Sequence, residues 1–333
     1  MNRRRLAALV AILLSLAETS AGESALQQQN AILLQELRDV HQLTAAQMAR
    51  ITQIFASSAY IGQGNPAVTR HPMTPEECVA RTGGARTYAN PSFERICGAK
   101  FMAPLYDPAS QRPQDAKACI DQFEFPDIPC AYPVVWVTAR QAAELCAAEG
   151  KRLCDAHEWE GACAGALGEP DYRFDLARGQ PTEEAVERMQ AAHNRAYAPT
   201  KSWSYGPAYV RGICAADSVK SATCNGGNFA GCGSNTYPAG SFPQCRSPLG
   251  VYDLNGNAAE HMNLPLAPDQ MSSAGSTKLG VTEMKGSWFI FDRYYAHPDW
   301  CRWRAPFWHG STVLSPASHL NYHLGFRCCK TLD

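Results

Sequence analysis

The sequence has no excess of charge of either sign. Its 333 residues include 30 Lys and Arg and 31 Asp and Glu, so the formal net charge is −1. Such a chain has no basic field that would attract nucleic acid, and no acidic run that would indicate a solvated tail. We therefore expect no nucleic acid among its partners.

Common nucleotide and metal motifs are also missing. The sequence has no Walker loop, no Gly-x-Gly-x-x-Gly after an expected strand, no zinc-knuckle spacing and no repeat of fixed period. It has no Cys-x-x-Cys pair, which argues against a zinc ribbon and a thioredoxin-like site. With 45% hydrophobic and 18% charged residues, the composition is that of one large globular domain or two small ones.

The first residues predict export to the periplasm or the extracellular space. Arg3–Arg5 precede an apolar run of about a dozen residues, and Thr19 and Ala21 fit a signal-peptidase site, so residues 1–21 are predicted to be a signal peptide. The run is shorter than the roughly 20 residues of a spanning helix, so no membrane span is expected after cleavage. An uncleaved anchor is the alternative. No Cys follows the run, so a lipid anchor is not expected.

Fourteen cysteines agree with export, because disulfides are the default state of cysteine in an oxidising compartment. The number is even, so every cysteine can be paired. Metal ligation by a few of them is the alternative.

Residues 22–62 are expected to form a helical hairpin that either docks on the main domain or binds a partner. Thr44 and Gln47 have the spacing of a capping box at the start of the second helix. Four apolar residues recur at helical spacing in the first helix: Ile32, Leu33, Leu37 and Val40.

Residues 63–117 are predicted to be an irregular linker segment, because Gly-rich stretches and Pro91, Pro104, Pro108 and Pro113 interrupt regular elements. A local disulfide between the two cysteines of this segment would staple it: Cys78 and Cys97.

The pattern becomes regular from residue 118. "ACIDQFEF" and "YPVVWV" are typical of strands. Two helices should follow, each with a capping box at its start and the first ending at Gly150. The two boxes are Thr138 with Gln141 and Asp155 with Glu158.

Residues 165–248 are expected to be rich in loops. The four cysteines of this region are Cys214, Cys224, Cys232 and Cys245. They should pair among themselves, and the sequence does not choose among the three possible connectivities. Further strands are expected at "MKGSWFIF" and "HLGFRCC", and a strand with a tight Asn-Gly turn at "GVYDLNGNAAEHM".

Four motifs over residues 118–330 resemble the sulfatase-modifying-factor family, whose best-known member is the formylglycine-generating enzyme. They are "PVVWVTARQAAELCAAEGKRLCDAHEWEGACAG", "GVYDLNGNAAEHM", "KGSW" and "GFRC". The resemblance implies that residues 118–333 form an α+β domain with a loop-rich, disulfide-stapled fold like that of C-type lectins.

The resemblance also implies two disulfides, Cys146–Cys328 and Cys163–Cys301, although Cys329 could replace Cys328. It does not assign the partners of Cys119, Cys130 and Cys154. It further implies a calcium loop with Asp253 and Glu260 as carboxylate ligands and Gly256 and Ala258 as carbonyl ligands. A plain Asn-Gly turn with both acids in solvent is the alternative.

The family's copper chemistry needs two cysteines, because soft thiolates select Cu(I). Gly286 and Ser287 set the register, and the two cysteine positions then fall near Ile290 and Tyr295. Neither is Cys, so we do not expect formylglycine formation.

Two classes of function remain. The first is a module that binds a peptide, protein or glycan in a groove lined by aromatic side chains. The groove candidates are Trp288, Phe291, Tyr294, Tyr295, Trp300, Trp303, Phe307 and Trp308, with Arg293, Arg302 and Arg304 for an anionic ligand. The alternative is that about half of these aromatic side chains belong to the core.

The second class is a divergent oxidoreductase with copper or iron on histidines. Its candidate ligands are His261, His297, His309, His319 and His323. The pocket expected for it holds Ser287, Ile290, Tyr294, Tyr295, His309 and His323. A structural role through the N-terminal helices is a third hypothesis.

Overall fold

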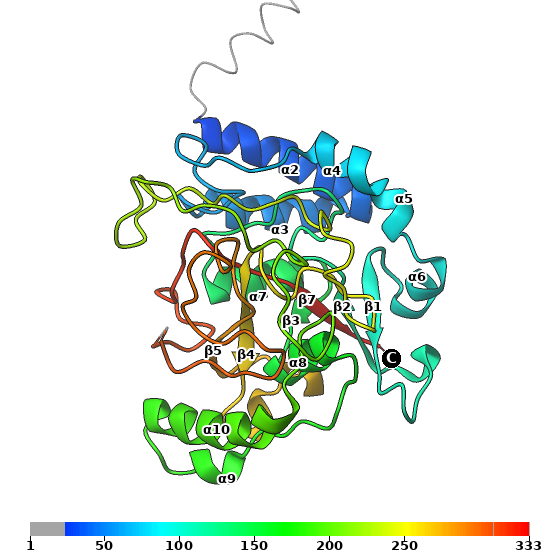
Figure 1. The fold of residues 1–333 in the computed structure, drawn as a ribbon, viewed down its shortest axis with the longest axis vertical. Helices are drawn as coiled ribbons and strands as arrows, with labels where there is room; N and C mark the ends of the chain where they lie inside the picture. The colour runs from blue at the N-terminus through cyan, green and yellow to red at the C-terminus, as the bar shows by residue number, and fades with distance from the viewer. Residues whose placement is uncertain (1–23, 309, 333) are drawn as a thin grey trace, which may run out of the picture.

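A computed structural model describes residues 24–308 and 310–332. The predicted signal peptide and His309 lie outside the described residues. Two small sheets occupy the middle of the molecule, with N-terminal helices across one end and helices α9 and α10 across the other (Figure 1). The expected α+β, loop-rich and disulfide-stapled fold is confirmed.

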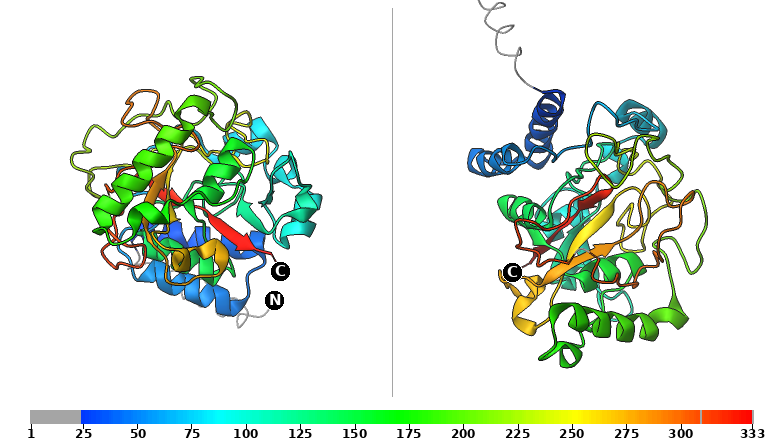
Figure 2. Two further views of the ribbon diagram at one scale, coloured as in Figure 1. Left: turned by 90° about the horizontal axis from the view of Figure 1, so that it is seen from below. Right: turned by 90° about the vertical axis from the view of Figure 1, so that its left-hand side faces the viewer.

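The N-terminal helical hairpin is present as predicted. Helix α2 (Ala25–His41) and helix α3 (Ala45–Ala56) each begin with a capping box, at Ser24 and Thr44. Their buried apolar side chains belong to one core cluster with helix α7 (Ala139–Ala148). These helices are therefore docked on the main domain, as two views at right angles to Figure 1 also show (Figure 2).

The prediction of an irregular segment over residues 63–117 is wrong. It contains helices α4 (Pro75–Thr82), α5 (Ala85–Tyr88) and α6 (Pro91–Cys97) and strand β1 (Met102–Leu105). Pro75 and Pro91 begin helices instead of interrupting them, because the first helical position needs no N–H donor.

The local disulfide predicted for this segment is also wrong. Cys78 bonds to Cys130, and Cys97 bonds to Cys119. Each bond joins the segment to residues after 118, so residues 78–105 are stapled to the main domain and are not a free linker.

The first sheet has four antiparallel strands in the order β1-β2-β7-β3. Strand β2 (Ala118–Asp121) pairs with β1 and with the C-terminal strand β7 (Cys328–Thr331), which also pairs with β3 (Arg152–Leu153). The strand predicted at residues 132–137 does not form. Only Val135 makes a bridge, to Gly62, and Trp136 has a left-handed backbone (φ 57°) that ends any pairing.

The second sheet has three strands in the order β5-β4-β6. Central strand β4 (Ala259–Leu264) runs antiparallel to β5 (Val281–Lys285) and parallel to β6 (Leu324–Phe326). The strand expected at "MKGSWFIF" thus ends at Lys285, because Gly286 takes a left-handed conformation (φ 72°).

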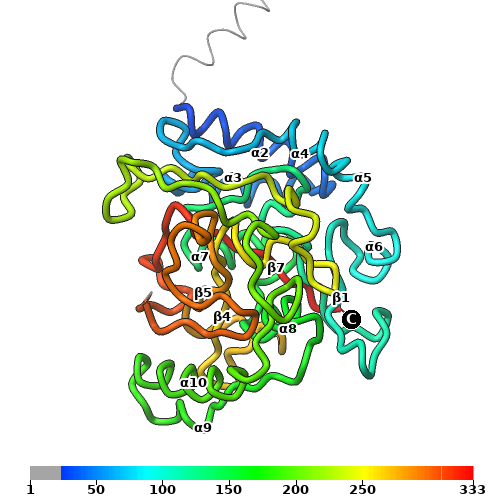
Figure 3. Tube along the Cα trace, viewed as in Figure 1, coloured from blue at the N-terminus to red at the C-terminus, as the bar shows by residue number. Residues whose placement is uncertain are grey.

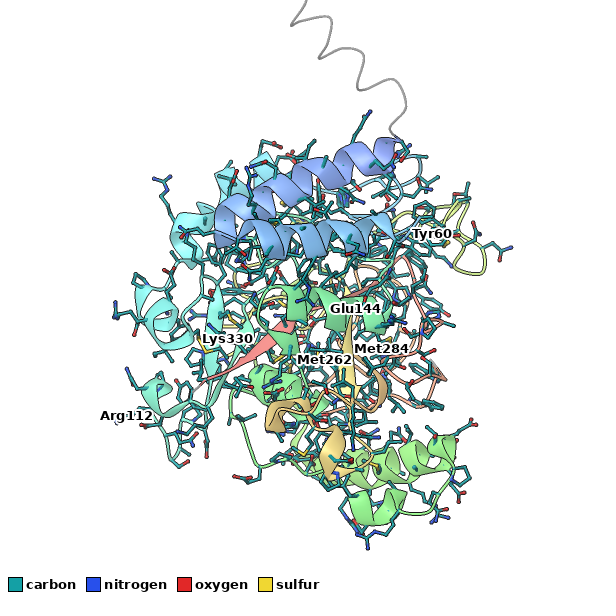
Figure 4. The ribbon with its side chains drawn as sticks, turned by 180° about the vertical axis from the view of Figure 1, so that it is seen from behind. Tyr60, Arg112, Glu144, Met262, Met284 and Lys330 are labelled. Carbon is teal, nitrogen blue, oxygen red and sulfur yellow. A yellow bond between two sulfur atoms is a disulfide. The ribbon has the colours of Figure 1, made fainter. Side chains whose placement is uncertain are left out.

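Met262 of β4 and Met284 of β5 mark the centre of the molecule, whereas Tyr60 and Arg112 lie at opposite edges (Figure 4). Helix α8 (Ala156–Ala164) is buried over nearly its whole length, and α7 and α8 begin at the predicted caps. Four short 3-10 helices lie at Pro113–Asp115, Ala198–Thr200, Pro268–Gln270 and Ser272–Ala274.

The region 165–248 is only partly loop. Helix α9 (Phe174–Ala177) and helix α10 (Thr182–Tyr197) lie within it and were not predicted. Acidic residues in the first turn of α10 and the helical spacing of Ala185, Val186 and Met189 were usable signals. The tube in Figure 3 shows that the chain after α10 runs across the molecule as a long irregular segment.

All fourteen cysteines form seven disulfides. Cys146–Cys328 and Cys163–Cys301 are the pairs that the family resemblance implies, and Cys329 bonds to Cys154. The four cysteines of the loop region pair among themselves, as Cys214–Cys245 and Cys224–Cys232. Within the described ranges, no helix is both long enough and apolar enough to cross a membrane.

Candidate functional site

The segment 286–308 follows β5 and is fixed at its start by the loop 253–260. The Ser287 hydroxyl accepts a hydrogen bond from the Gly256 N–H (2.9 Å) and donates one to Asp299 (3.0 Å). The Phe289 N–H donates to the Asn257 carbonyl (2.8 Å). Ser287 is therefore a structural anchor, and its hydroxyl is already engaged.

Half of the eight aromatic side chains predicted to line a groove are buried. Besides Trp288, these are Phe291, Trp300 and Trp303, each less than a tenth exposed. The groove prediction is wrong for these three, because the loop-rich fold uses large side chains to fill its core. Tyr294, Tyr295 and Trp308 are more than half exposed.

The aromatic rings pack on two histidines. His323 stacks on Trp288 with ring centroids 4.5 Å apart, and His297 stacks on Trp303 at 4.9 Å. The exposed Tyr295 packs on the buried Phe291 at 5.1 Å. His323 of the predicted pocket therefore packs against Trp288, whereas Tyr295 packs against Phe291.

Arg304, also predicted for the groove, is buried in an ionic network. Its guanidinium pairs with Glu160 (3.0 Å) and Asp171 (2.8 Å), and Lys285 pairs with Glu160 as well (2.6 Å). Burial alone would raise the pKa of Asp171, but His193 and Arg304 outweigh it and hold that pKa at about 2. The Arg304 backbone also exchanges hydrogen bonds with the Asn194 side chain of α10 (2.8 and 2.9 Å). Arg304 therefore holds α10 to the domain, and its buried guanidinium is not available to a ligand.

One cavity does open at the predicted position. It has a volume of about 350 Å³, and we call it the Trp288 pocket. Ile290 and Tyr294 were predicted for this site. The lining residues Val219, Lys220 and Tyr322, which come from two other loops, were not predicted. Its lining is Val219, Lys220, Trp288, Ile290, Arg293, Tyr294 and Tyr322.

The Trp288 pocket combines apolar walls with cations at its edge. The indole N–H of Trp288 is buried and has no hydrogen-bond partner among the described residues. Arg293 pairs with the exposed Asp217 (2.9 Å), and no carboxylate partner of Lys220 occurs within residues 24–308 and 310–332. The pocket can therefore take a ligand with an apolar body and a negative charge.

The predicted histidine ligands do not gather. No three of the described histidines offer nitrogen atoms within 4.8 Å of one another. His261 bonds the Val137 carbonyl from inside the core, and burial lowers the pKa of His297 and of His319.

Glu160, Asp171 and His193 are the one group of metal-ligating side chains with close donor atoms in the described part of the chain. Lys285 and Arg304 already neutralise its carboxylates. This group therefore acts as an ion-pair network and does not fit a metal ion.

Both acids of the loop expected to bind calcium are buried, so the alternative of a plain turn with Asp253 and Glu260 in solvent is wrong. Asp253 accepts a hydrogen bond from the Gly240 N–H, and burial raises its pKa to about 7. One oxygen of Asp253 has no partner among the described residues, which suits a cation. Glu260 does not fit as a ligand, because the Arg327 guanidinium holds both of its oxygens at 2.7 Å. The calcium site stays a prediction, resting on Asp253 and backbone carbonyls.

The family model described as the sulfatase-modifying factor enzyme 1-like domain matches residues 67–332. This chain belongs to the sulfatase-modifying factor enzyme 1-like family. The match includes most of the segment 63–117, in agreement with its disulfides to the main domain.

Two solved structures are similar to this family member. PvdO from Pseudomonas aeruginosa is 16% identical, with 70% of this chain and 91% of PvdO covered and a TM-score of 0.31. CarF is also 16% identical, with 60% of this chain and 68% of CarF covered and a TM-score of 0.25. A search of curated proteins gives no match.

The first prediction separates Glu260 from calcium. Glu260→Gln removes one partner of a buried ion pair, so it should destabilise the protein by roughly 3–5 kcal/mol. The loss in melting temperature should be equal in calcium and in EDTA. Asp253→Asn is the comparison and should lower the melting temperature in calcium only. A Glu260→Gln effect that disappears in EDTA would show that Glu260 does bind the ion.

The second prediction concerns Asp299, which is buried and receives hydrogen bonds from Trp203 and Ser287. Burial raises its pKa to about 6. A carboxyl with a raised folded-state pKa stabilises the fold when protonated, so this contribution is lost as pH rises from about 4 to about 6.

Asp299→Asn should remove about 3 kcal/mol of pH-dependent stability over that window. Urea unfolding at a series of pH values measures it, with Asp175→Asn on the exposed face of α9 as the control. Parallel pH profiles of the wild type and Asp299→Asn would contradict the assignment.

Proposed function

We propose that this protein is an exported binding module that does not form formylglycine. Its ligand has an apolar or aromatic body and a negative charge, and it occupies the Trp288 pocket. The supporting observation is that a 350 Å³ cavity with apolar walls and cationic edges lies where the resemblance implies a pair of catalytic cysteines.

The chemistry of the cysteines supports the loss of formylglycine formation. Ile290 and Tyr295 stand near the two positions that would be thiolates, and Cys301 bonds to Cys163. Since all fourteen cysteines are in disulfides, none offers a thiolate to Cu(I).

The disulfides also support export. Seven disulfides in one chain are typical of proteins that fold in an oxidising compartment. Together with the predicted signal peptide, they favour a periplasmic or extracellular location.

The third prediction tests the pocket with the aromatic anion 1-anilinonaphthalene-8-sulfonate. Val219 is about half exposed at the rim, so Val219→Trp should fill the pocket without disturbing the core. The dye should bind the wild type, and its affinity for the Val219→Trp variant should be at least about tenfold lower. Fluorescence titration measures both affinities.

Val210→Trp is the matched control, since Val210 is similarly exposed and does not line the Trp288 pocket. Lys220→Gln should weaken dye binding about three- to tenfold, and Lys117→Gln should not. Equal binding by Val219→Trp and Val210→Trp would place the dye elsewhere and overturn the proposed site.

The fourth prediction compares the binding module with a histidine-based oxidase. Protein from an oxidising host should show no alkylated cysteine after denaturation without reductant, and fourteen after reduction. Copper and iron together should stay below about a tenth of an equivalent, unchanged by His323→Ala. A full equivalent of either metal that His323→Ala or His309→Ala removes would favour the oxidase instead.

A further inference from the structure

A second cavity lies apart from the Trp288 pocket and shares no lining residue with it. Its volume is about 450 Å³. It is lined by Ser202–Gly206, by Arg246–Pro248 and by Ala164 at the end of α8. We call it the Ser204 pocket.

Disulfides hold all three lining segments in place. Ala164 follows Cys163, which bonds to Cys301, and the Cys301 N–H donates to the Ser202 carbonyl (2.8 Å). Arg246 follows Cys245, which bonds to Cys214. The pocket is therefore preorganised, so that binding there orders few groups.

Trp203 contributes an aromatic wall with a fixed orientation. Its indole N–H donates to the buried Asp299 carboxylate (2.8 Å), which also accepts from Ser287. The backbone closes around this wall, because Trp203 and Gly206 exchange two hydrogen bonds. A tryptophan held in this way offers a rigid apolar surface to a ring.

Hydroxyl groups surround the wall. Ser202, Ser204, Tyr205 and Ser247 all line the pocket. The Ser204 N–H is held by Asn255 (3.0 Å), but its buried hydroxyl has no hydrogen-bond partner among the described residues. Such a group is costly to leave unpaired, and rotation about one side-chain bond can turn it toward a ligand.

Arg246 is the only charged residue in the lining of the Ser204 pocket. Its guanidinium lies over the Tyr252 ring at 5.7 Å, and it makes no ion pair with the described carboxylates. A pocket with one free guanidinium and no acid in its lining favours an anion, and a guanidinium matches a carboxylate geometrically.

We infer that the Ser204 pocket binds an acidic sugar, a hydroxylated ring that carries one carboxylate. The carboxylate pairs with Arg246, the ring lies on Trp203, and the sugar hydroxyls bond with the serines. The volume is within the range of small-molecule sites. This site is independent of the ligand proposed for the Trp288 pocket.

The fifth prediction tests this site with three probes: glucuronate, glucose and acetate. Saturation-transfer NMR on the exported protein should detect glucuronate, with glucose and acetate at least about tenfold weaker. Arg246→Gln should weaken glucuronate at least about tenfold. Ser204→Ala, which removes only the unpaired hydroxyl, should weaken it without lowering the melting temperature.

Arg140→Gln is the matched control, because Arg140 is exposed on α7 and pairs only with Glu144. If acetate binds as tightly as glucuronate, the inference that the ligand contains a sugar ring is wrong. If glucose binds as tightly as glucuronate, the inferred role of Arg246 in binding the carboxylate is wrong. Equal loss in Arg140→Gln and Arg246→Gln would overturn the site. Dye binding at the Trp288 pocket should be unchanged in Arg246→Gln, so the two proposals fail separately.

Discussion

The ion pair between Arg327 and Glu260 is the contact on which most of the structure depends. Both side chains are buried, and the guanidinium holds both carboxylate oxygens at 2.7 Å. Its remaining N–H groups donate to the carbonyls of Asp121, Gln122 and Tyr252. One side chain between β6 and β7 thereby joins β2 of the first sheet to β4 of the second. A lysine at this position could not make these bonds, because it lacks the planar fork of five donors.

The same ion pair positions the candidate site indirectly. Glu260 ends the loop 253–260, and that loop holds Ser287 and Phe289 through backbone groups. The motifs behind the family resemblance therefore build the scaffold: the Asn-Gly loop, the Gly-Phe-Arg-Cys strand and the first residues after β5. The resemblance implies that the family's copper chemistry depends on two cysteines further along, and Ile290 and Tyr295 stand near those positions here. A chain can thus match the family over residues 67–332 and still lack its cysteine pair.

The features that the residues alone predict are the local ones, whereas the family resemblance added the fold class and two long-range disulfides, Cys146–Cys328 and Cys163–Cys301. Capping boxes at Thr44, Thr138 and Asp155 mark helix starts within a few residues, so they were identified correctly. The burial of Arg304 could not be predicted, because its partner Glu160 lies 144 residues away in sequence. The same holds for the lining of the Trp288 pocket, since Lys220 and Tyr322 come from loops without a regular pattern. The strand expected at residues 132–137 failed for a related reason: its apolar run is buried in a loop that tertiary contacts hold in place.

Cys328 and Cys329 are neighbours in β7 and bond to Cys146 and Cys154, at separations of 182 and 175 residues. Synthesis from the N-terminus therefore produces both earlier cysteines long before their partners. In an oxidising compartment, those thiols can meanwhile form disulfides with Cys163, Cys214 or another nearby cysteine. Any non-native pair made in this way has to be exchanged for the native one by attack of a thiolate on the disulfide.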